Sequence, residues 1–286
     1  MVQAAYNLSL PGNRTSCVVF ASPHSGSHYP PAFLTQTILD NHAIRSSEDA
    51  FVNTLFDAAP DFGAPFLTAV APRAYLDLNR SADELDPALI EGVRKGGHNP
   101  RVASGLGVIP RVVAGGRAIY RGKLPLAEAN ARVNQVWRPY HNRLQRLLDE
   151  SHARFGQAIL IDCHSMPREA LDGTSRSHSK RPEVVLGDRF GASASSEVVD
   201  RVEAAFAAAG LHVVRNSPFA GAYVTQAYGR PSRRQHAIQI EIDRALYMDE
   251  ATISPNANFD AMRALLRAVV ADIATIGQER MPLAAE

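Results

Sequence analysis

The sequence contains little cysteine, which excludes a fold held together by a disulfide framework. Its 286 residues include only Cys17 and Cys163, and each lies in an apolar run typical of a buried strand. Because so sparse a use of cysteine is typical of a reducing compartment, we expect both thiols to be free.

The sequence also lacks an excess of one charge and any long hydrophobic run. Its 30 Lys and Arg residues balance 29 Asp and Glu residues, for a formal net charge of +1, so no electrostatic argument favours nucleic acid or an anionic membrane as a partner. No stretch of about 18 uncharged apolar residues predicts a transmembrane helix. Residues 1–10 show no signal-peptide pattern. We therefore expect a cytoplasmic protein without a membrane partner.

A short basic cluster, Arg230–Arg234, is the feature that would suit nucleic acid best. Clusters of this length are more often solvated loops, so we expect no nucleic-acid partner. Neither an internal repeat nor a low-complexity linker interrupts the chain, and we interpret residues 1–286 as a single domain. The oligomeric state does not follow from the sequence.

Three short apolar runs predict buried strands, and each brings an ionisable residue to its C-terminal end. They are Cys17–Ala21, which leads to His24, Ala158–Ile161, which leads to His164, and Ile238–Ile242, which contains Glu241. Continuous apolar runs are typical of strands covered by helices on both faces.

Helical periodicity fills the segments between and after these strands. One helix is expected around 127–155, with a kink or break at Pro139. A second is expected from Ser195 or Ser196 to Gly210, and a third over 256–276. The alternation of strands and helices predicts an α/β fold: a mixed, mostly parallel sheet flanked by helices on both faces.

His24 and His164 are candidate metal ligands, because the carboxyl ends of parallel strands meet at one edge of a sheet. A catalytic zinc site typically takes three protein ligands from His, Asp and Glu and leaves one position for water. The alternative is that each histidine is a hydrogen-bonded loop residue. His236 precedes the Glu241 strand and could point into the same crevice.

The third ligand is ambiguous, because two adjacent carboxylates, Glu48 and Asp49, precede an apolar stretch at 50–59 that looks helical. Capping of that helix explains Asp49 equally well.

Glu241 lies in a run that otherwise predicts an interior strand, where an ionised carboxylate is costly unless it is paired or belongs to a site. Near a metal it could act as a general acid/base. A salt bridge to Arg244 or Arg234 is the structural alternative. After a strand-like segment at 73–76, Arg80 offers a planar fork suited to a carboxylate, and Asn79 could add a hydrogen bond.

Seven motifs in this order resemble the N-formylglutamate amidohydrolase family, a branch of the zinc carboxypeptidase-like hydrolases. They are Ser22–Gly26, Glu48–Asp49, Asp77–Arg80, Trp137–His141, Asp162–Ser165, Pro218–Thr225 and Glu241–Glu250.

The resemblance implies a zinc carboxypeptidase or phosphorylase/hydrolase-like fold and hydrolysis of N-formyl-L-glutamate to formate and L-glutamate, a step of histidine breakdown. It implies one divalent metal ion, zinc, held by His24, His164 and Asp49, with Glu48 as the alternative carboxylate. Glu241 would be the catalytic base. Arg80, Asn79 and Thr225 would bind the small N-acyl amino acid.

The sequence departs from the wider carboxypeptidase pattern at one position. That pattern has a ligand Glu three residues after the first His, where this chain has Ser27. The carboxylate ligand must therefore come from elsewhere. Two alternatives stay open: a hydrolase of another N-acyl amino acid, and a catalytically silent relative that binds an amino acid.

Overall fold

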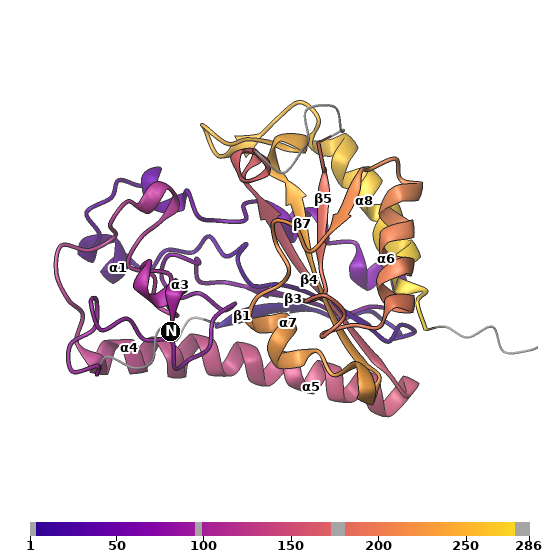
Figure 1. Cartoon of the computed structure of the whole chain (residues 1–286), viewed down its shortest axis with the longest axis horizontal. Coiled ribbons are helices and arrows are strands. Elements are labelled where there is room, and N and C mark those ends of the chain that lie inside the picture. Colours follow the sequence, from indigo (N-terminus) through magenta and orange to yellow (C-terminus); the bar gives the residue numbers. More distant parts are fainter. Residues whose placement is uncertain (1–3, 95–98, 173–180, 278–286) are drawn as a thin grey trace, which may run out of the picture.

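A seven-stranded sheet in the order β1-β3-β2-β4-β7-β5-β6 forms the centre of the molecule (Figure 1). The computed structural model describes residues 4–94, 99–172 and 181–277. Strands β2, β3, β4 and β7 are parallel, whereas β1 and β5 run antiparallel to their neighbours β3 and β7. The predicted mixed, mostly parallel sheet is confirmed. The strands are β1 (Tyr6–Ser9), β2 (Val18–Ser22), β3 (Phe66–Ala69), β4 (Ala158–Met166), β5 (Val184–Gly187), β6 (Val213–Arg215) and β7 (Gln235–Asp243), with a separate β8 (Met248–Asp249) and β9 (Ser254–Pro255) pair.

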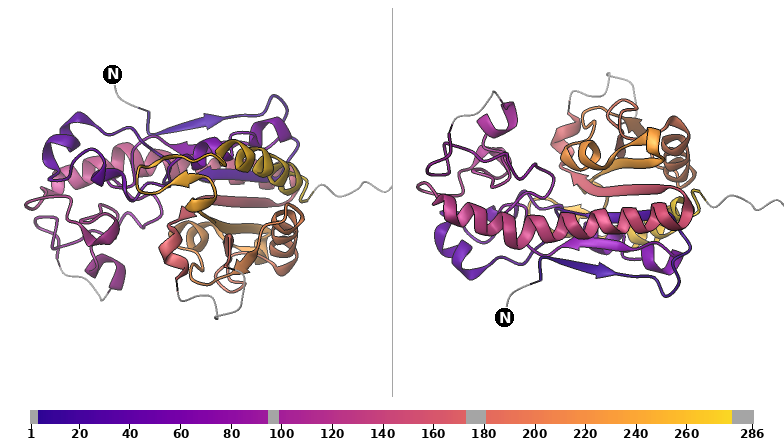
Figure 2. Two further views of the ribbon diagram at one scale, coloured as in Figure 1. Left: turned by 90° about the horizontal axis from the view of Figure 1, so that it is seen from above. Right: turned by 90° about the horizontal axis from the view of Figure 1, so that it is seen from below.

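Helices cover both faces of the sheet, as predicted (Figure 2). Helix α5 packs against β2 and β4 on one face, and α6 and α8 pack against each other on the opposite face. The helices are α1 (Pro31–Gln36), α2 (Val52–Leu55), α3 (Pro100–Ala103), α4 (Leu126–Arg132), α5 (Arg138–Phe155), α6 (Ser196–Ala208), α7 (Tyr223–Tyr228) and α8 (Phe259–Ala274). No described helix is long and apolar enough to cross a bilayer.

The break predicted at Pro139 is present in the structure as a change of helix type. A π-helical turn, Val133–Trp137, separates α4 from α5, and Pro139 lies in the first turn of α5. Proline has no N–H to donate, so it fits at the start of a helix and not in its interior.

The three predicted strands are adjacent in the sheet, in the order β2, β4, β7. β4 and β7 are nine residues long and pair over their full length, so His164 lies opposite Glu241 inside the strands and not after them. Successive side chains of a strand alternate between faces. Cys163 and Ile240 belong to the core beneath α6 and α8. His164 and Glu241 therefore share the opposite face, with their neighbours two residues earlier.

Two local expectations have clear outcomes. Residues 73–76 are a turn and not a strand, because the backbone N–H groups of Tyr75 and Leu76 both donate to the carbonyl of Pro72. Cys17 and Cys163 are buried and free, as expected.

Candidate metal centre and substrate cavity

His24 is held in a turn directly after β2. Gly26 makes this turn feasible, since a Cβ on Gly26 would overlap the backbone carbonyl of Ala71. The carbonyl of His24 accepts the backbone N–H of Asp49 at 3.1 Å. This hydrogen bond links two segments that lie far apart in the sequence and brings Asp49 to the end of β2.

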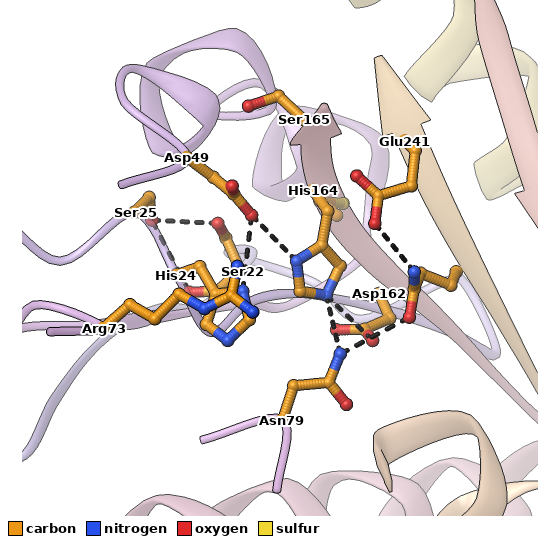
Figure 3. Close-up of polar contacts among 12 residues, drawn as sticks. Ser22, His24, Ser25, Asp49, Arg73, Asn79, Asp162, His164, Ser165 and Glu241 are labelled. Atoms are coloured by element: carbon orange, nitrogen blue, oxygen red, sulfur yellow. Dashed lines mark hydrogen bonds and ion pairs between the residues drawn. The ribbon is translucent and has the colours of Figure 1, made fainter. Parts of the chain in front are cut away.

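The side chains of His24, Asp49 and His164 converge, and their ligand atoms lie within 4.8 Å of one another. Oδ2 of Asp49 is 2.8 Å from Nδ1 of His164 and 3.4 Å from Nδ1 of His24. Figure 3 shows this carboxylate oxygen facing both rings. All three residues are at most 2% exposed, so water does not compensate for any unpaired atom among them.

Two further carboxylates lie beside the opposite nitrogens of the two rings. Nε2 of His24 is 2.6 Å from Oδ1 of Asp77, and Nε2 of His164 is 3.0 Å from Oδ2 of Asp162. A carboxylate at one ring nitrogen keeps the proton there and leaves the other nitrogen bare for a metal. Asp77 therefore favours the tautomer of His24 that leaves its Nδ1 bare and directed toward Asp49. At His164 both ring nitrogens lie near a carboxylate oxygen, Nε2 near Asp162 and Nδ1 near Asp49.

The donor set fits a divalent metal ion. Nδ1 of His24 is buried and has no hydrogen-bond partner, which is costly for a polar atom unless something else binds it. Two histidine nitrogens and one carboxylate oxygen form a common catalytic zinc ligand set.

The histidine rings and the carboxylates of the cluster shift one another's pKa values. Burial alone would lower the pKa of His164, but Asp162 and Asp49 raise it well above its usual value. Burial likewise opposes ionisation of Asp49, yet His164 and His24 hold the pKa of Asp49 well below its usual range. A metal would thus compete with a proton for this site.

The adjacent acid, Glu48, faces away from the cluster. Its carboxylate accepts the Tyr29 hydroxyl at 2.5 Å and Nε of Arg45 at 3.1 Å. Of the two carboxylates left open by the sequence, the structure brings only Asp49 to the two histidines. Asp49 is not a helix cap, because its side chain contacts His164, His24 and Arg244.

Glu241 lies beside His164 on the neighbouring strand. Nε2 of Gln239 donates to its Oε1 at 2.8 Å, and within the described residues it forms no ion pair. Arg244 pairs instead with Asp49 at 3.0 Å, and Arg234 donates to Gln157. Burial raises the pKa of Glu241 to about 7, against the lowering effect of His164. A carboxyl group with such a pKa is suited to transferring protons near neutral pH.

Both His24 and Glu241 face a cavity of about 450 Å³ that opens beyond the carboxyl ends of the strands. Its lining consists of His24, Asp49, Arg73, Asn79, Arg80, Arg101, Leu106, His164, Ser165, Met166, Pro167, Pro218, Phe219, Ala220, Gly221, Ala222, Gln239, Glu241 and Arg244.

Comparison with known proteins identifies the family of this chain. The sequence model of the N-formylglutamate amidohydrolase family matches residues 16–248. The chain belongs to this family. The matched range contains every candidate metal, catalytic and substrate-binding residue considered above.

Individual relatives share nearly the whole chain. An N-formylglutamate deformylase of Pseudomonas aeruginosa is 32% identical over 92% of this chain and 94% of its own length. The crystal structure of the N-formylglutamate amidohydrolase from Ralstonia eutropha JMP134 superimposes with a TM-score of 0.90 at 34% identity, covering 96% of this chain and 99% of that one. A gene product from Agrobacterium tumefaciens, at 17% identity and a TM-score of 0.63 over 95% of this chain and 96% of that one, shares the fold.

Among the residues expected to bind substrate, Arg80 lies at the cavity in a fixed orientation. Its Nε donates to the carbonyl of Leu106 at 2.9 Å, and a second guanidinium nitrogen donates to the carbonyl of Asn79 at 3.1 Å. Two of its three nitrogens are thus held by the backbone. The indole N–H of Trp137 fixes the Arg80 carbonyl at 2.9 Å.

Asn79 and Thr225 are engaged within the protein. Oδ1 of Asn79 accepts the backbone N–H of Val224 at 2.8 Å, and its Nδ2 approaches Nε2 of His164 at 3.2 Å. The Thr225 hydroxyl donates to the carbonyl of Ala222, and Thr225 is not among the residues that line the cavity. Their roles in substrate binding stay predictions.

Sequence reasoning missed several residues of the site. Arg73, Arg101, Arg244 and Gln239 all line the cavity. Asp162 and Gln239 could have been found, since each precedes a candidate residue by two positions in a strand and so shares its face. The arginines come from turns and a short helix that carry no such signal. His236 lies near the start of β7, far along the strand from Glu241, and accepts the backbone N–H of Ser195. It is not part of the cavity lining.

Proposed function

We propose that this protein hydrolyses N-formyl-L-glutamate to formate and L-glutamate, with one divalent metal ion, zinc, bound by His24, Asp49 and His164. The observation that carries the proposal is the buried, unpartnered Nδ1 of His24, which faces Asp49 beside a second histidine and next to Glu241. Membership of the family supplies the substrate class.

A divalent ion in such a site supplies a Lewis acid that polarises a carbonyl oxygen and acidifies water. The contribution of the chain is to orient the ligands and to move the proton. Asp77 holds Nε2 of His24, so that Nδ1 of this ring stays bare and directed toward Asp49, and Asp162 lies beside Nε2 of His164.

Glu241 is the general base in this proposal. It takes a proton from the attacking water and then donates it to the nitrogen of the scissile formamide, so that formate and the free amine separate. Its raised pKa matches both halves of this task. Gln239 donates to one carboxylate oxygen and leaves the other for the proton.

Arg80 binds a carboxylate of the substrate. Its guanidinium is always charged and its planar fork is oriented by the carbonyls of Leu106 and Asn79, which favours bidentate recognition. Asn79 and Thr225 are the further substrate-binding residues of the proposal. Asn79 lines the cavity and holds the backbone of Val224, whereas Thr225 lies outside the lining and acts through the turn at Ala222. The cytoplasmic location and the place in histidine breakdown are further parts of the proposal.

The test is release of formate and glutamate by the purified protein, with N-formyl-L-glutamate and N-acetyl-L-glutamate compared at equal concentration. We expect turnover of the formyl substrate at a rate well above that of the acetyl substrate. A pocket at the acyl end discriminates a single added methyl by about 10- to 200-fold. A preference for the acetyl substrate would assign the chain to another N-acyl amino acid, and binding without turnover of either would indicate a catalytically silent relative.

A further inference from the structure

The cavity is lined by four arginines, which differ in how their charges are balanced. Arg73 pairs with Asp77 at 3.0 Å and Arg244 pairs with Asp49 at 3.0 Å. Neither Arg80 nor Arg101 forms an ion pair within the part of the chain that the structure describes. Among the described residues these two arginines therefore lack a direct ion-pair partner, although the charges of Asp77 and Glu84 still act on Arg80.

Arg80 and Arg101 also lie at a common boundary. Both line the catalytic cavity and an adjoining cavity of about 440 Å³. Arg80 is 6% exposed, and burial is the chief cause that lowers its pKa. The charge of Asp77 opposes this lowering, and the charges of Arg73 and Arg101 add to it. Arg101, in contrast, is an exposed residue of α3. The first guanidinium is therefore deep in the wall, and the second stands at the rim.

We propose that Arg101 binds the side-chain carboxylate of the substrate while Arg80 binds its α-carboxylate, so that the two arginines together select N-acyl dicarboxylic amino acids. This inference rests on the proposed function, because it takes the substrate to be an N-acyl glutamate with its amide carbonyl at His24, His164 and Glu241.

The covalent structure of the substrate decides which carboxylate binds which arginine. The α-carboxylate is attached to the carbon that bears the amide nitrogen, so it must bind close to the reacting carbonyl. The side-chain carboxylate extends beyond it by two methylene groups and can reach the rim. A fixed, buried arginine suits the first, and an exposed arginine suits the second. Two arginines without a direct ion-pair partner among the described residues then match the two anionic groups of the ligand.

Glu84 lines the adjoining cavity and forms no ion pair with Arg101 among the described residues. Its carboxylate accepts the backbone N–H of Ser81 at 3.1 Å and the Asn99 amide at 3.3 Å. Arg189 lines the adjoining cavity too, but not the catalytic cavity. It provides a matched control, because it has the same charge in nearly the same place without access to the reacting groups.

The experiment compares kcat/KM of Arg101→Gln and Arg189→Gln on N-formyl-L-glutamate and N-formyl-L-glutamine, which differ in the side-chain charge. For Arg101→Gln we expect a loss of about 10- to 100-fold on the glutamate substrate, mostly in KM, because one charge-assisted hydrogen bond is lost. The same variant should change the glutamine substrate less than about threefold, within the range of surface effects. Arg189→Gln should lose little kcat/KM on either substrate. Arg101→Lys keeps the charge without the fork and should fall between wild type and Arg101→Gln.

Equal losses on both substrates in Arg101→Gln would overturn the assignment. So would equal losses in the Arg101 and Arg189 variants that vanish at high salt, since that pattern indicates only long-range attraction of anions. Failure of the proposed function has a different signature, because the wild-type protein would then release no formate from either substrate.

Discussion

The inner end of the catalytic cavity and its outer wall are charged in opposite ways. At the inner end, carboxylates surround two histidines, and Asp49, Asp77 and Asp162 are each 2% exposed or less. At the outer wall, Arg80 and Arg101 form no direct ion pair in the described part of the chain. The carboxylates at the inner end favour binding of a cation, and the guanidinium groups at the outer wall favour binding of an anion. One cavity thus contains a site suited to a metal beside a site suited to carboxylates.

The most severe way to break the inner end is to remove a metal ligand. His164→Ala should abolish stoichiometric zinc binding. It should also reduce kcat by more than roughly 10⁴-fold, which is the upper end of the loss expected when only acid–base catalysis is removed. Metal content after dialysis and formate release would be measured together. His236→Ala alters a buried histidine near the opposite end of β7 and should keep the metal. Full metal content in His164→Ala would contradict the ligand assignment.

Removing only the base should separate metal binding from catalysis. Glu241→Gln keeps the shape of the side chain but cannot accept a proton, so kcat should fall by about 10²- to 10⁴-fold while zinc stays bound. A rate near that of the wild type would show that another group transfers the proton.

The outer wall should respond in substrate affinity and not in metal content. Arg80→Ala removes a charge-assisted hydrogen bond to a carboxylate, for a loss of about 10- to 100-fold in kcat/KM that includes a raised KM. Zinc content should be unchanged. An unaltered KM would remove Arg80 from the substrate site.

The support of the ligands can be weakened without removing one. Asp77→Asn should weaken zinc affinity by about 10- to 100-fold, because the amide no longer favours the tautomer of His24 that leaves Nδ1 bare. Asp86→Asn is the matched control, since Asp86 is equally buried but pairs with Arg111 at 2.9 Å outside the cavity. Equal zinc affinity in the two variants would contradict a role for Asp77 in orienting His24.

The smallest expected effect is on the pH profile. Glu241 acts as a base only when ionised, so kcat/KM should rise with pH as its proton leaves. Burial raises the pKa of Glu241 to about 7 in the metal-free protein, and a nearby cation lowers it, so the acid limb should lie at or below about pH 7. A rate that falls as pH rises through this range would contradict the assignment.

Much of the fold could be predicted from the sequence, because apolar runs and helical spacing record burial directly. The three central strands and the gathering of His24 and His164 near their carboxyl ends followed from that signal, although His164 lies inside β4. The choice between Glu48 and Asp49 could not, since neighbouring side chains in a turn point in directions that no simple period fixes. Asp49 reaches the site through a backbone hydrogen bond to His24, which is a long-range contact.

The balance of charge in the cavity could not be predicted from the sequence either. Arg244 and Arg73 looked no different from Arg80 and Arg101 until their partners were known. Asp77 and Asp162 acquire a function only through the ring nitrogens that they contact. Such pairings depend on which loops fold over the strand ends, and local sequence does not encode this.

The most direct test of the metal-dependent hydrolysis is a zinc titration of chelator-treated protein, with formate release from N-formyl-L-glutamate as the readout. We predict no turnover without metal and a linear rise that saturates at one equivalent of zinc per chain in the wild type, with no recovery in His164→Ala. Full activity in metal-free protein, or the same zinc dependence in His164→Ala, would contradict this prediction.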